Sequence, residues 1–341
     1  MEKVDFILTW VDGSDPEWHA EKQKFEGNIV DDPVDDANAE NRYRPDTELL
    51  RYWFRAVEKY APWVNKIHFV TCGQKPDWLI ECHPKLAFVN HKDFIPSSYL
   101  PTFNANAIEM NFHRIEGLSE QYVYFNDDFF LTRPVEDTFF FKGGAPVLMT
   151  NLQYFKSIGY NNWSRLLFND YCIVNNSFDI GKSIWKNREK WFNIKELGLK
   201  NAGINFLCYG VNRTIPVHLY GHVALPHLKS SLQEIWDRWP DVMNQSCYHK
   251  FRTDDQVNQW LLCAWNQARG SFYPSHRNRV GKMFQLSPNN VEEVSDAIRN
   301  QRYPQICIND SLSNTEPARC TAEISKAFQS ILPDKSSFEK D

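Results

Sequence analysis

Two adjacent carboxylates follow a short apolar run and are the first candidates for shared chemistry. The run Tyr122–Phe125 is typical of a buried strand, and it ends at Asn126-Asp127-Asp128. Mg²⁺ and Mn²⁺ prefer hard oxygen ligands and leave coordination positions open for diphosphate oxygens. Asp127 and Asp128 are therefore candidate ligands of a divalent cation. A plain polar turn is the alternative, because two adjacent Asp residues are a weak motif by themselves.

A second polar turn follows an apolar run near the N-terminus. Val4–Val11 predicts a strand, which leads into Asp12–Pro16. Backbone amides exposed by such a turn can contact a nucleotide or a phosphate. Trp10 can stack on a base, although a single Trp is more often part of a core. In the alternative interpretation, Asp12 and Asp15 only form an Asx-type turn and cap the next helix.

Positive charge for an acidic substrate is available in the C-terminal half. Arg252, within His249–Arg252, offers a planar fork for phosphate oxygens. His222 follows Gly221 and can take or give a proton near neutral pH. A lone His is usually a structural group, but four of them lie in this region, at His218, His222, His227 and His249.

The segment Leu100–Glu109 leads into a helix that we expect over Asn104–Ile115. Glu109 and His113 lie four residues apart, so they share one face of this helix, whereas Arg114 does not. A surface helix with a salt-bridge pair is the plain interpretation of this segment taken alone.

The elements that position these residues alternate between strand and helix. Apolar runs predict strands at 67–71, 86–90 and 306–308, the last ending at Asn309-Asp310, and helical spacing predicts a helix over 47–60. This alternation predicts an α/β fold, a Rossmann-like or GT-A-like, mostly parallel sheet flanked by helices. Ligands of such sheets bind beyond the carboxyl ends of the strands, so the loops at Asp12 and Asp127 are expected to share one site.

We expect four parts along the chain. Residues 1–150 form an α/β part whose polar turns could contact a nucleotide, 151–215 an inserted helical subdomain and 216–333 the remainder of the main domain. Helical patterning is expected from His222 to Arg269, and helices at 288–302 and 318–332. The tail 334–341 is expected to fray, and the acidic stretch 31–40 to be a solvated loop.

Composition excludes several classes of protein. The net charge of −5 provides no global attraction for nucleic acid, and none is expected as a partner. The eight Cys residues form no C-x-x-C pair, which argues against a zinc site. No signal peptide is recognisable, and no segment approaches the roughly 18 apolar residues of a transmembrane helix. We therefore expect a cytoplasmic protein with reduced thiols.

Together these segments resemble the Stealth family of sugar-phosphate transferases. That family includes bacterial capsular polysaccharide phosphotransferases and the animal GlcNAc-1-phosphotransferase of lysosomal enzymes. Its four regions, in order, resemble Asp5–Pro16, Arg42–Asp128, Gly221–Arg252 and Cys307–Ser311. The second is the most specific and contains Leu100–Asn104 and His113–Ser119. His222 best fits the first His of the third region, and His227 is the alternative.

The resemblance implies a reaction and a set of site residues. The donor would be a UDP-sugar, commonly UDP-GlcNAc or a related hexosamine, and the cofactor Mg²⁺ or Mn²⁺. A hydroxyl of a polysaccharide or lipid-linked oligosaccharide would attack the β-phosphorus, giving a phosphodiester and UMP. The essential positions would be Glu109, Asp128, His222 and Arg252. Substrate contacts would come from Trp10, Asp12, Gly13, Asp15, Arg44, Asn104, Asn106 and Arg114. The metal would be held by Asp127, Asp128 and Asp310.

Individual roles follow from the chemistry of phosphoryl transfer, in which positioning and charge stabilisation dominate. Arg252 would offset charge on the transferring group, and His222 would relay the acceptor proton, with Glu109 a rival. The size and the missing extra modules of the animal enzyme favour the bacterial capsule branch. Peripheral association with membrane capsule machinery, at the inner face of the membrane, is compatible with this branch.

Two other functions compete with this hypothesis. A metal-dependent glycosyltransferase would use the same donor and sheet but attack the anomeric carbon and release UDP. A non-catalytic sugar-nucleotide-binding subunit of a capsule assembly complex would not turn the donor over at all. The nucleotide released, UMP or UDP, separates the first from a phosphotransferase, and any turnover dismisses the second.

Overall fold

The structure is a computed structural model that describes residues 2–26, 48–152, 162–212, 221–276, 280–310 and 317–340. The acidic stretch 31–40, Arg44 and His218 lie outside these residues, so the expectations for them stay predictions.

A five-stranded sheet forms the centre of the molecule, in the order β3-β2-β1-β4-β8. Its strands are β1 Val4–Thr9, β2 Lys66–Thr71, β3 Leu86–Asn90, β4 Gln121–Phe125 and β8 Leu225–Leu228. The first four are parallel, and β8 pairs antiparallel with β4. Strands β1 and β4 are almost completely buried, as expected for parallel strands covered on both faces. The α/β fold with a mostly parallel sheet is confirmed.

Strand β8 lies in a segment that we expected to be helical. Residues Leu225–Leu228 are all buried, and a short apolar run in a core has the same appearance in a strand and in a helix. The expectation of helical patterning from His222 to Arg269 is therefore wrong at its start.

Two three-stranded sheets adjoin the central one. The first has the order β10-β11-β5, and the second β6-β7-β9. Their strands are β5 Phe129–Leu131, β6 Phe141–Lys142, β7 Ala145–Met149, β9 Tyr273–Ser275, β10 Lys282–Leu286 and β11 Gln305–Asp310. Because β5 directly follows the Asp127-Asp128 turn and pairs antiparallel with β11, the C-terminal strand reaches the end of β4.

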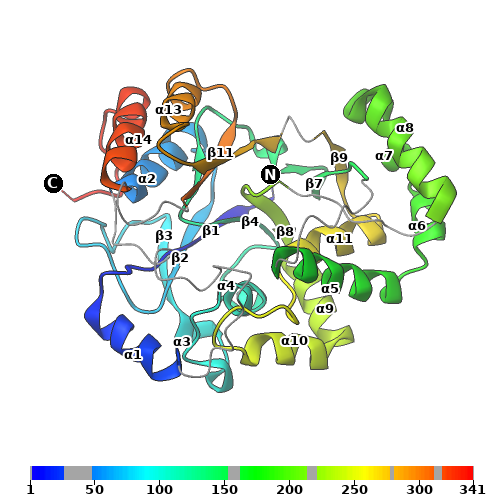
Figure 1. The fold of residues 1–341 in the computed structure, drawn as a ribbon, viewed down its shortest axis with the longest axis horizontal. Helices are drawn as coiled ribbons and strands as arrows, with labels where there is room; N and C mark the ends of the chain where they lie inside the picture. Colours follow the sequence, from blue (N-terminus) through cyan, green and yellow to red (C-terminus); the bar gives the residue numbers. More distant parts are fainter. Residues whose placement is uncertain are drawn as a thin grey trace.

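Helices cover both faces of the central sheet (Figure 1). Above it in the view lie α2 Leu49–Tyr60, α13 Val291–Arg299 and α14 Pro317–Ile331. Below it lie α1 Pro16–Glu26, α3 His91–Phe94, α4 Ala105–Glu109, α9 Lys229–Arg238 and α10 Pro240–Tyr248. Three 3₁₀ turns complete these layers, η3 Ser97–Tyr99, η4 Phe112–Arg114 and η5 Asp137–Phe139.

The helices of the expected insertion form one side of the molecule, at the right in Figure 1. They are α5 Asn162–Ser177, α6 Ile180–Lys186, α7 Arg188–Trp191 and α8 Ile194–Asn212. Helix α5 packs against α11, Trp260–Arg269. Val174, Ile184 and Trp191 are fully buried in the same hydrophobic core as the central sheet. The block is therefore continuous with the main core and does not have one of its own.

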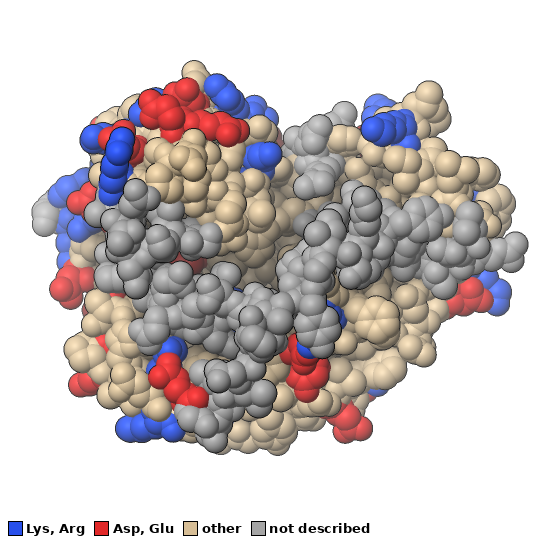
Figure 2. All heavy atoms as spheres, in the orientation of Figure 1, with Lys and Arg blue, Asp and Glu red and all other residues tan. Residues whose placement is uncertain are grey.

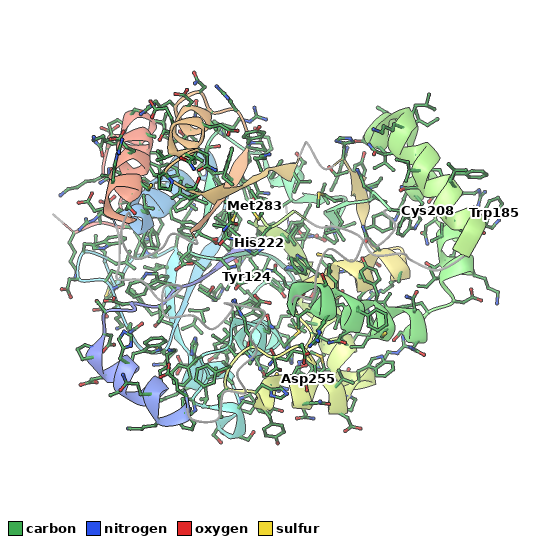
Figure 3. All side chains as sticks on the ribbon, viewed as in Figure 1. Tyr124, Trp185, Cys208, His222, Asp255 and Met283 are labelled. Atoms are coloured by element: carbon green, nitrogen blue, oxygen red, sulfur yellow. The ribbon has the colours of Figure 1, made fainter. Side chains whose placement is uncertain are left out.

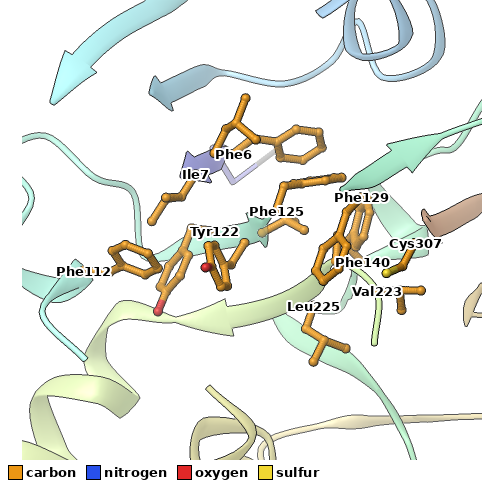
Figure 4. Close-up of a cluster of buried hydrophobic side chains, with 14 of the residues drawn as sticks. Phe6, Ile7, Phe112, Tyr122, Phe125, Phe129, Phe140, Val223, Leu225 and Cys307 are labelled. Carbon is orange, nitrogen blue, oxygen red and sulfur yellow. The ribbon is translucent and has the colours of Figure 1, made fainter. Parts of the chain in front are cut away.

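Aromatic residues dominate the core beside the sheet (Figure 4). The rings of Phe6 on β1 and Phe125 on β4 lie 4.8 Å apart, and Phe140 lies 5.8 Å from Phe6. Figure 4 shows Val223 and Cys307 next to Phe129, so three distant segments of the chain meet here. This contact fixes the end of β4 relative to β11.

The predicted helix over Asn104–Ile115 is interrupted. Helix α4 ends at Glu109, and Asn111, whose side chain donates to the carbonyl of Ala107 at 2.8 Å, separates it from η4. Glu109 and His113 are both buried, so the interpretation as a surface helix with a salt-bridge pair is wrong. The interruption turns Glu109 toward the interior.

The C-terminal tail does not fray. Phe338 is 2% exposed and its ring lies 5.3 Å from that of Phe54 on α2. Arg55 donates to both carboxylate oxygens of Glu339, each at 2.8 Å. An apolar anchor and a buried two-bond ion pair hold the last residues on α2, and the sequence prediction missed both.

Among the described residues, no helix combines the length and the apolar character needed to cross a bilayer.

Candidate active site

Asp128, His222 and Cys307 form a compact cluster at the end of β4. One ligand-type atom of each lies within 4.8 Å of those of the other two. The Cys307 thiol donates to Asp128 Oδ2 at 3.3 Å, and the His222 ring packs edge-on against Phe129 at 5.0 Å. The turn after β4, the segment before β8 and strand β11 each contribute one residue. The sequence separates these residues by up to 179 positions.

Glu109 lies in the interior at the end of α4. The backbone amide of Gln259 donates to Glu109 Oε2 at 3.2 Å, and Tyr124 hydrogen-bonds the same carboxyl group. Burial raises the pKa of Glu109 to about 7, while the positive charge of Arg252 opposes that rise. The charge of Glu109 therefore changes near neutral pH.

Tyr124 links Glu109 to the acidic turn. Its hydroxyl lies 3.2 Å from Thr9 Oγ1 and also contacts Asn126 Oδ1, just before Asp127. This connection between the ends of β1 and β4 is what the parallel pairing of these strands predicts.

The four residues expected to be essential therefore lie in one region of the fold. Glu109 and Arg252 interact, Tyr124 connects Glu109 to the turn after β4, and that turn carries Asp128 beside His222. His222 and Tyr124 lie near the middle of the view in Figure 3, where the surface in the same orientation is hollowed (Figure 2).

Asn104 positions the loop that carries Arg252. Its amide nitrogen donates to the carbonyls of His249 and Phe251, both at 3.1 Å, while its oxygen caps α4 through the Asn106 amide. Asn104 is fully buried and uses its amide within the protein. Its expected contact with substrate stays a prediction.

Asn106 and Asn169 hold the same loop. Asn106 donates to the side chain of Gln256, and Asn169 donates to the carbonyls of Asp254 and Gln256. Asn106 is buried, so it too supports the loop and does not face substrate.

The turn after β1 is built as a cap. Asp12 Oδ1 accepts from the amide and the hydroxyl of Ser14, and Asp15 Oδ1 accepts from the amides of Glu17 and Trp18 at the start of α1. Gln74 also donates to Asp15 and helps to lower its pKa. The Asx-turn interpretation is confirmed for both carboxylates.

The two other residues predicted around this turn have their own contacts. Trp10 is 8% exposed and stacks on Phe69, so it belongs to the core and offers no open face to a base. The carbonyl of Gly13 contacts the ring of His19.

Other predicted residues lie apart from this cluster. Arg114 bonds Asn111 and lies over the Trp236 ring on α9, at 4.8 Å, so it is not part of the cluster. Asp127 is exposed at the turn, and Asp310 pairs through its backbone with Leu286 at the end of β11.

The neighbouring histidines have different surroundings. His227 is buried in β8 and burial lowers its pKa to about 4, so it is neutral at pH 7. His249 lies 3.1 Å from Asp255. Of these three, it is His222 that lies beside Asp128, which favours the first of the two alignments of the third region.

Asp170 is a site residue that the sequence did not reveal. It is fully buried on α5 and accepts from the Asn258 amide at 3.3 Å, one residue before the amide that Glu109 accepts. Burial raises the pKa of Asp170, and the neighbouring Glu109 adds to that rise. Two buried carboxyl groups thus meet the N-terminal end of α11. No motif surrounds Asp170, and only the fold brings it here.

Tyr124 lies within the apolar run Tyr122–Phe125 and Cys307 at the start of the fourth region, and the sequence predicts no role for either side chain. Tyr124 has the appearance of a core aromatic in a buried strand. The role of its hydroxyl follows only from the position of Glu109 in the fold.

The residues at the turn fit a divalent cation in part. The Asp128 carboxylate is a hard oxygen donor, which suits Mg²⁺ or Mn²⁺, and it lies beside the His222 imidazole. Sulfur and imidazole ligands together would suit Zn²⁺ better, but the Cys307 thiol is engaged as a donor to Asp128.

Comparison with known proteins matches three of the four regions. The Stealth conserved region 1 matches residues 2–30, conserved region 2 matches 42–147 and conserved region 4 matches 296–341. The chain belongs to the Stealth family. The third region, over 221–252, stays a prediction, and the fourth extends through the docked tail.

Relatives in streptococci align along this whole Stealth chain. A capsular polysaccharide phosphotransferase, WcwK of Streptococcus pneumoniae, is 39% identical over 340 residues and 100% of both chains. A receptor polysaccharide phosphotransferase, WefC of Streptococcus oralis, is 38% identical over 99% of this chain and 100% of its own. The Streptococcus gordonii WefC is 37% identical over 99% of each.

Proposed function

We propose that this Stealth protein is a capsular or cell-surface polysaccharide phosphotransferase. It would move a hexose-1-phosphate, such as GlcNAc-1-phosphate, from a UDP-sugar to a hydroxyl of a polysaccharide or lipid-linked oligosaccharide. The main support is the meeting of Glu109, Asp128, His222 and Arg252 in one region, in a chain whose full-length relatives carry phosphotransferase names.

The proposed reaction exchanges one P–O bond for another. The acceptor oxygen bonds to the β-phosphorus, the bond from that phosphorus to the bridging oxygen breaks, and UMP leaves with that oxygen. The acceptor proton passes to the imidazole of His222, which lies at the edge of the acidic cluster.

Arg252 and Glu109 act as a pair in this proposal. The guanidinium offsets the charge on the transferring phosphoryl group. Glu109, anchored by Gln259 and Tyr124, holds Arg252 in place through its negative charge. The buried position of Glu109 favours this positioning role over direct proton transfer.

A divalent cation, Mg²⁺ or Mn²⁺, would be held by Asp127 and Asp128, with Asp310 a further candidate; when bound, it would neutralise the diphosphate charge. The chain itself orients Asp128 through the Cys307 thiol and the backbone bond from Ile308 to the Asp128 carbonyl, at 2.9 Å.

The nucleotide product tests the proposal. The purified chain is incubated with a panel of UDP-sugars and Mg²⁺ or Mn²⁺, with and without oligosaccharide acceptors, and the products are separated. Release of UMP with a new phosphodiester supports the proposal. Release of UDP identifies a glycosyltransferase, and no turnover with any donor and acceptor favours a binding subunit.

Arg252→Ala is the variant that tests the site. We expect turnover to fall about 100-fold or more, because charge on the transferring group loses its partner. Arg114→Ala, an exposed arginine outside the cluster, is the matched control and should retain activity. Normal turnover of Arg252→Ala would refute its role.

A further inference from the structure

The helices α6–α8 expose large apolar side chains. Nine large hydrophobic residues of the described chain are exposed, and six belong to this block. They are Trp185, Ile194, Leu199, Ile204, Phe206 and Leu207. Contiguous apolar surface of this kind marks an interaction site more often than a free surface.

Helix α8 is apolar on both sides. Gly198, with φ of 77°, interrupts it, and after this residue Leu199, Phe206 and Leu207 recur at spacings that place them on one face. These three are 57–74% exposed, whereas Cys208 on the other side is fully buried. A helix with one apolar face in the core and a second apolar face exposed is expected to have a partner on the exposed face.

Aromatic contacts join the three helices into one surface. Trp185 of α6 stacks on Tyr209 of α8 at 6.1 Å, and Phe192, just after α7, packs against Phe206 at 5.6 Å. Figure 3 shows Trp185 at the outer edge of the molecule, away from His222. Trp and Tyr side chains favour the boundary between water and hydrocarbon.

The charge of this block is opposite to that of the whole chain. From Ile180 to Asn212 there are six Lys and Arg against two Glu, in a protein of net charge −5. The exposed basic residues are Lys182, Lys186, Arg188, Lys195 and Lys200. Of these, Lys182 pairs with Asp179 at 2.8 Å. A basic, apolar surface complements anionic headgroups above acyl chains.

We propose that α6–α8 is a docking surface for a bilayer that contains anionic lipids. Leu199, Phe206 and Leu207 enter the boundary region, and the lysines contact the headgroups. Exposed Leu side chains favour this partner over a glycan, because sugars stack on flat aromatic faces and gain little from aliphatic chains. The inference is independent of the proposed reaction, since it concerns binding alone.

Vesicle sedimentation with the full chain tests the docking surface. The wild type should sediment with vesicles of phosphatidylglycerol and phosphatidylcholine, and much less with phosphatidylcholine alone. The triple variant Leu199→Ser, Phe206→Ser, Leu207→Ser should bind at least about 10-fold more weakly. The variant Lys186→Glu, Lys195→Glu, Lys200→Glu should lose the preference for anionic vesicles.

The matched control changes exposed apolar residues elsewhere. Phe168→Ser, Tyr248→Ser, Met283→Ser alters side chains that are 63%, 55% and 41% exposed, and it should bind vesicles as the wild type does. Thermal unfolding of each variant establishes that it is folded.

Several outcomes would overturn the proposal. These are no binding to anionic vesicles, equal binding by the triple apolar variant and the wild type, or equal loss in the control. The wild type could also fail to bind vesicles but self-associate or bind a soluble glycan. If the triple apolar variant abolished that interaction, the surface would be assigned to that partner instead.

Discussion

At the scale of single residues, the site depends on buried groups whose charge is set by their surroundings. Glu109 and Asp170 accept from successive backbone amides at the start of α11, and burial raises the pKa of both. The Cys307 thiol fixes the Asp128 carboxylate from a strand distant in sequence. Each of these arrangements makes a measurable prediction.

Glu109→Gln should change how stability depends on pH. The folded-state pKa of about 7 lies above the ordinary value of 4.5 for Glu, so the folded state holds the proton more tightly than the unfolded chain. This contribution is fully present below pH 4.5 and is lost as pH rises through 7. Gln stays neutral at every pH. The free energy of unfolding of the variant should therefore increase relative to that of the wild type with rising pH, by up to about 3 kcal/mol at pH 8.

Urea unfolding of both proteins at pH 5 and pH 8, with a chelator present, measures this difference. A wild type that gains stability relative to Glu109→Gln over that range would contradict the assigned shift.

Cys307→Ser should separate a thiol that orients Asp128 from a thiol that binds metal. A hydroxyl can donate to the same carboxylate, so we expect turnover with Mg²⁺ within about threefold of the wild type. Asp128→Asn is the matched variant, and its turnover should fall about 100-fold or more. Calorimetry measures metal binding by both proteins. Loss of metal binding in Cys307→Ser would show that sulfur is a ligand.

At the scale of elements, the loop between α10 and α11 is held by amide side chains. Asn104, Asn106 and Asn169 all donate to it, and it carries Arg252. These side chains fix the loop relative to α4 and α5, and through the loop they position the Arg252 guanidinium without facing it.

Asn104→Ala should weaken both stability and catalysis. The helix cap and two buried hydrogen bonds are lost, which together cost about 2–4 kcal/mol. The main effect on activity should appear in kcat, because Arg252 loses its position.

Asn90→Ala is the control, since Asn90 caps α3 with an exposed side-chain bond. It should cost about 1 kcal/mol and leave turnover unchanged. Equal activity of the two variants would exclude a positioning role for Asn104.

The parallel strands of the central sheet were predictable from the sequence, and the interior of the site was only partly so. Apolar runs located β2, β3 and β4 within one residue, because parallel strands buried on both faces are continuous apolar runs. The pattern could not show that Asn104 faces a loop of its own chain, because buried and substrate-facing Asn have the same sequence context. Asp170 had no local signal, since its neighbours across the cluster are distant in sequence.

At the scale of the whole molecule, one core joins both ends of the chain. Strand β11 pairs with β5, and the tail packs on α2. The prediction of a frayed tail failed because the side chains of Phe338 and Glu339 pack on α2, and backbone hydrogen bonds to residues 78 and 80 add to their attachment.

Phe338→Ala should therefore destabilise the protein by about 3–5 kcal/mol, because a fully buried ring is removed from the core. Lys335→Ala, an exposed change in the same tail, should stay within about 0.5 kcal/mol. Chemical denaturation of both variants checks this. Similar unfolding midpoints for the two variants would show that the Phe338 side chain contributes nothing to stability.

The position of β11 has a consequence for the chain during translation. Cys307 reaches Asp128 only after residues 305–310 have left the ribosome and paired with β5. A nascent chain that already contains β1, β4 and the Arg252 loop still lacks the strand that pairs with β5 and places the Cys307 thiol against Asp128. Premature termination before residue 305 should thus leave β5 without its partner strand.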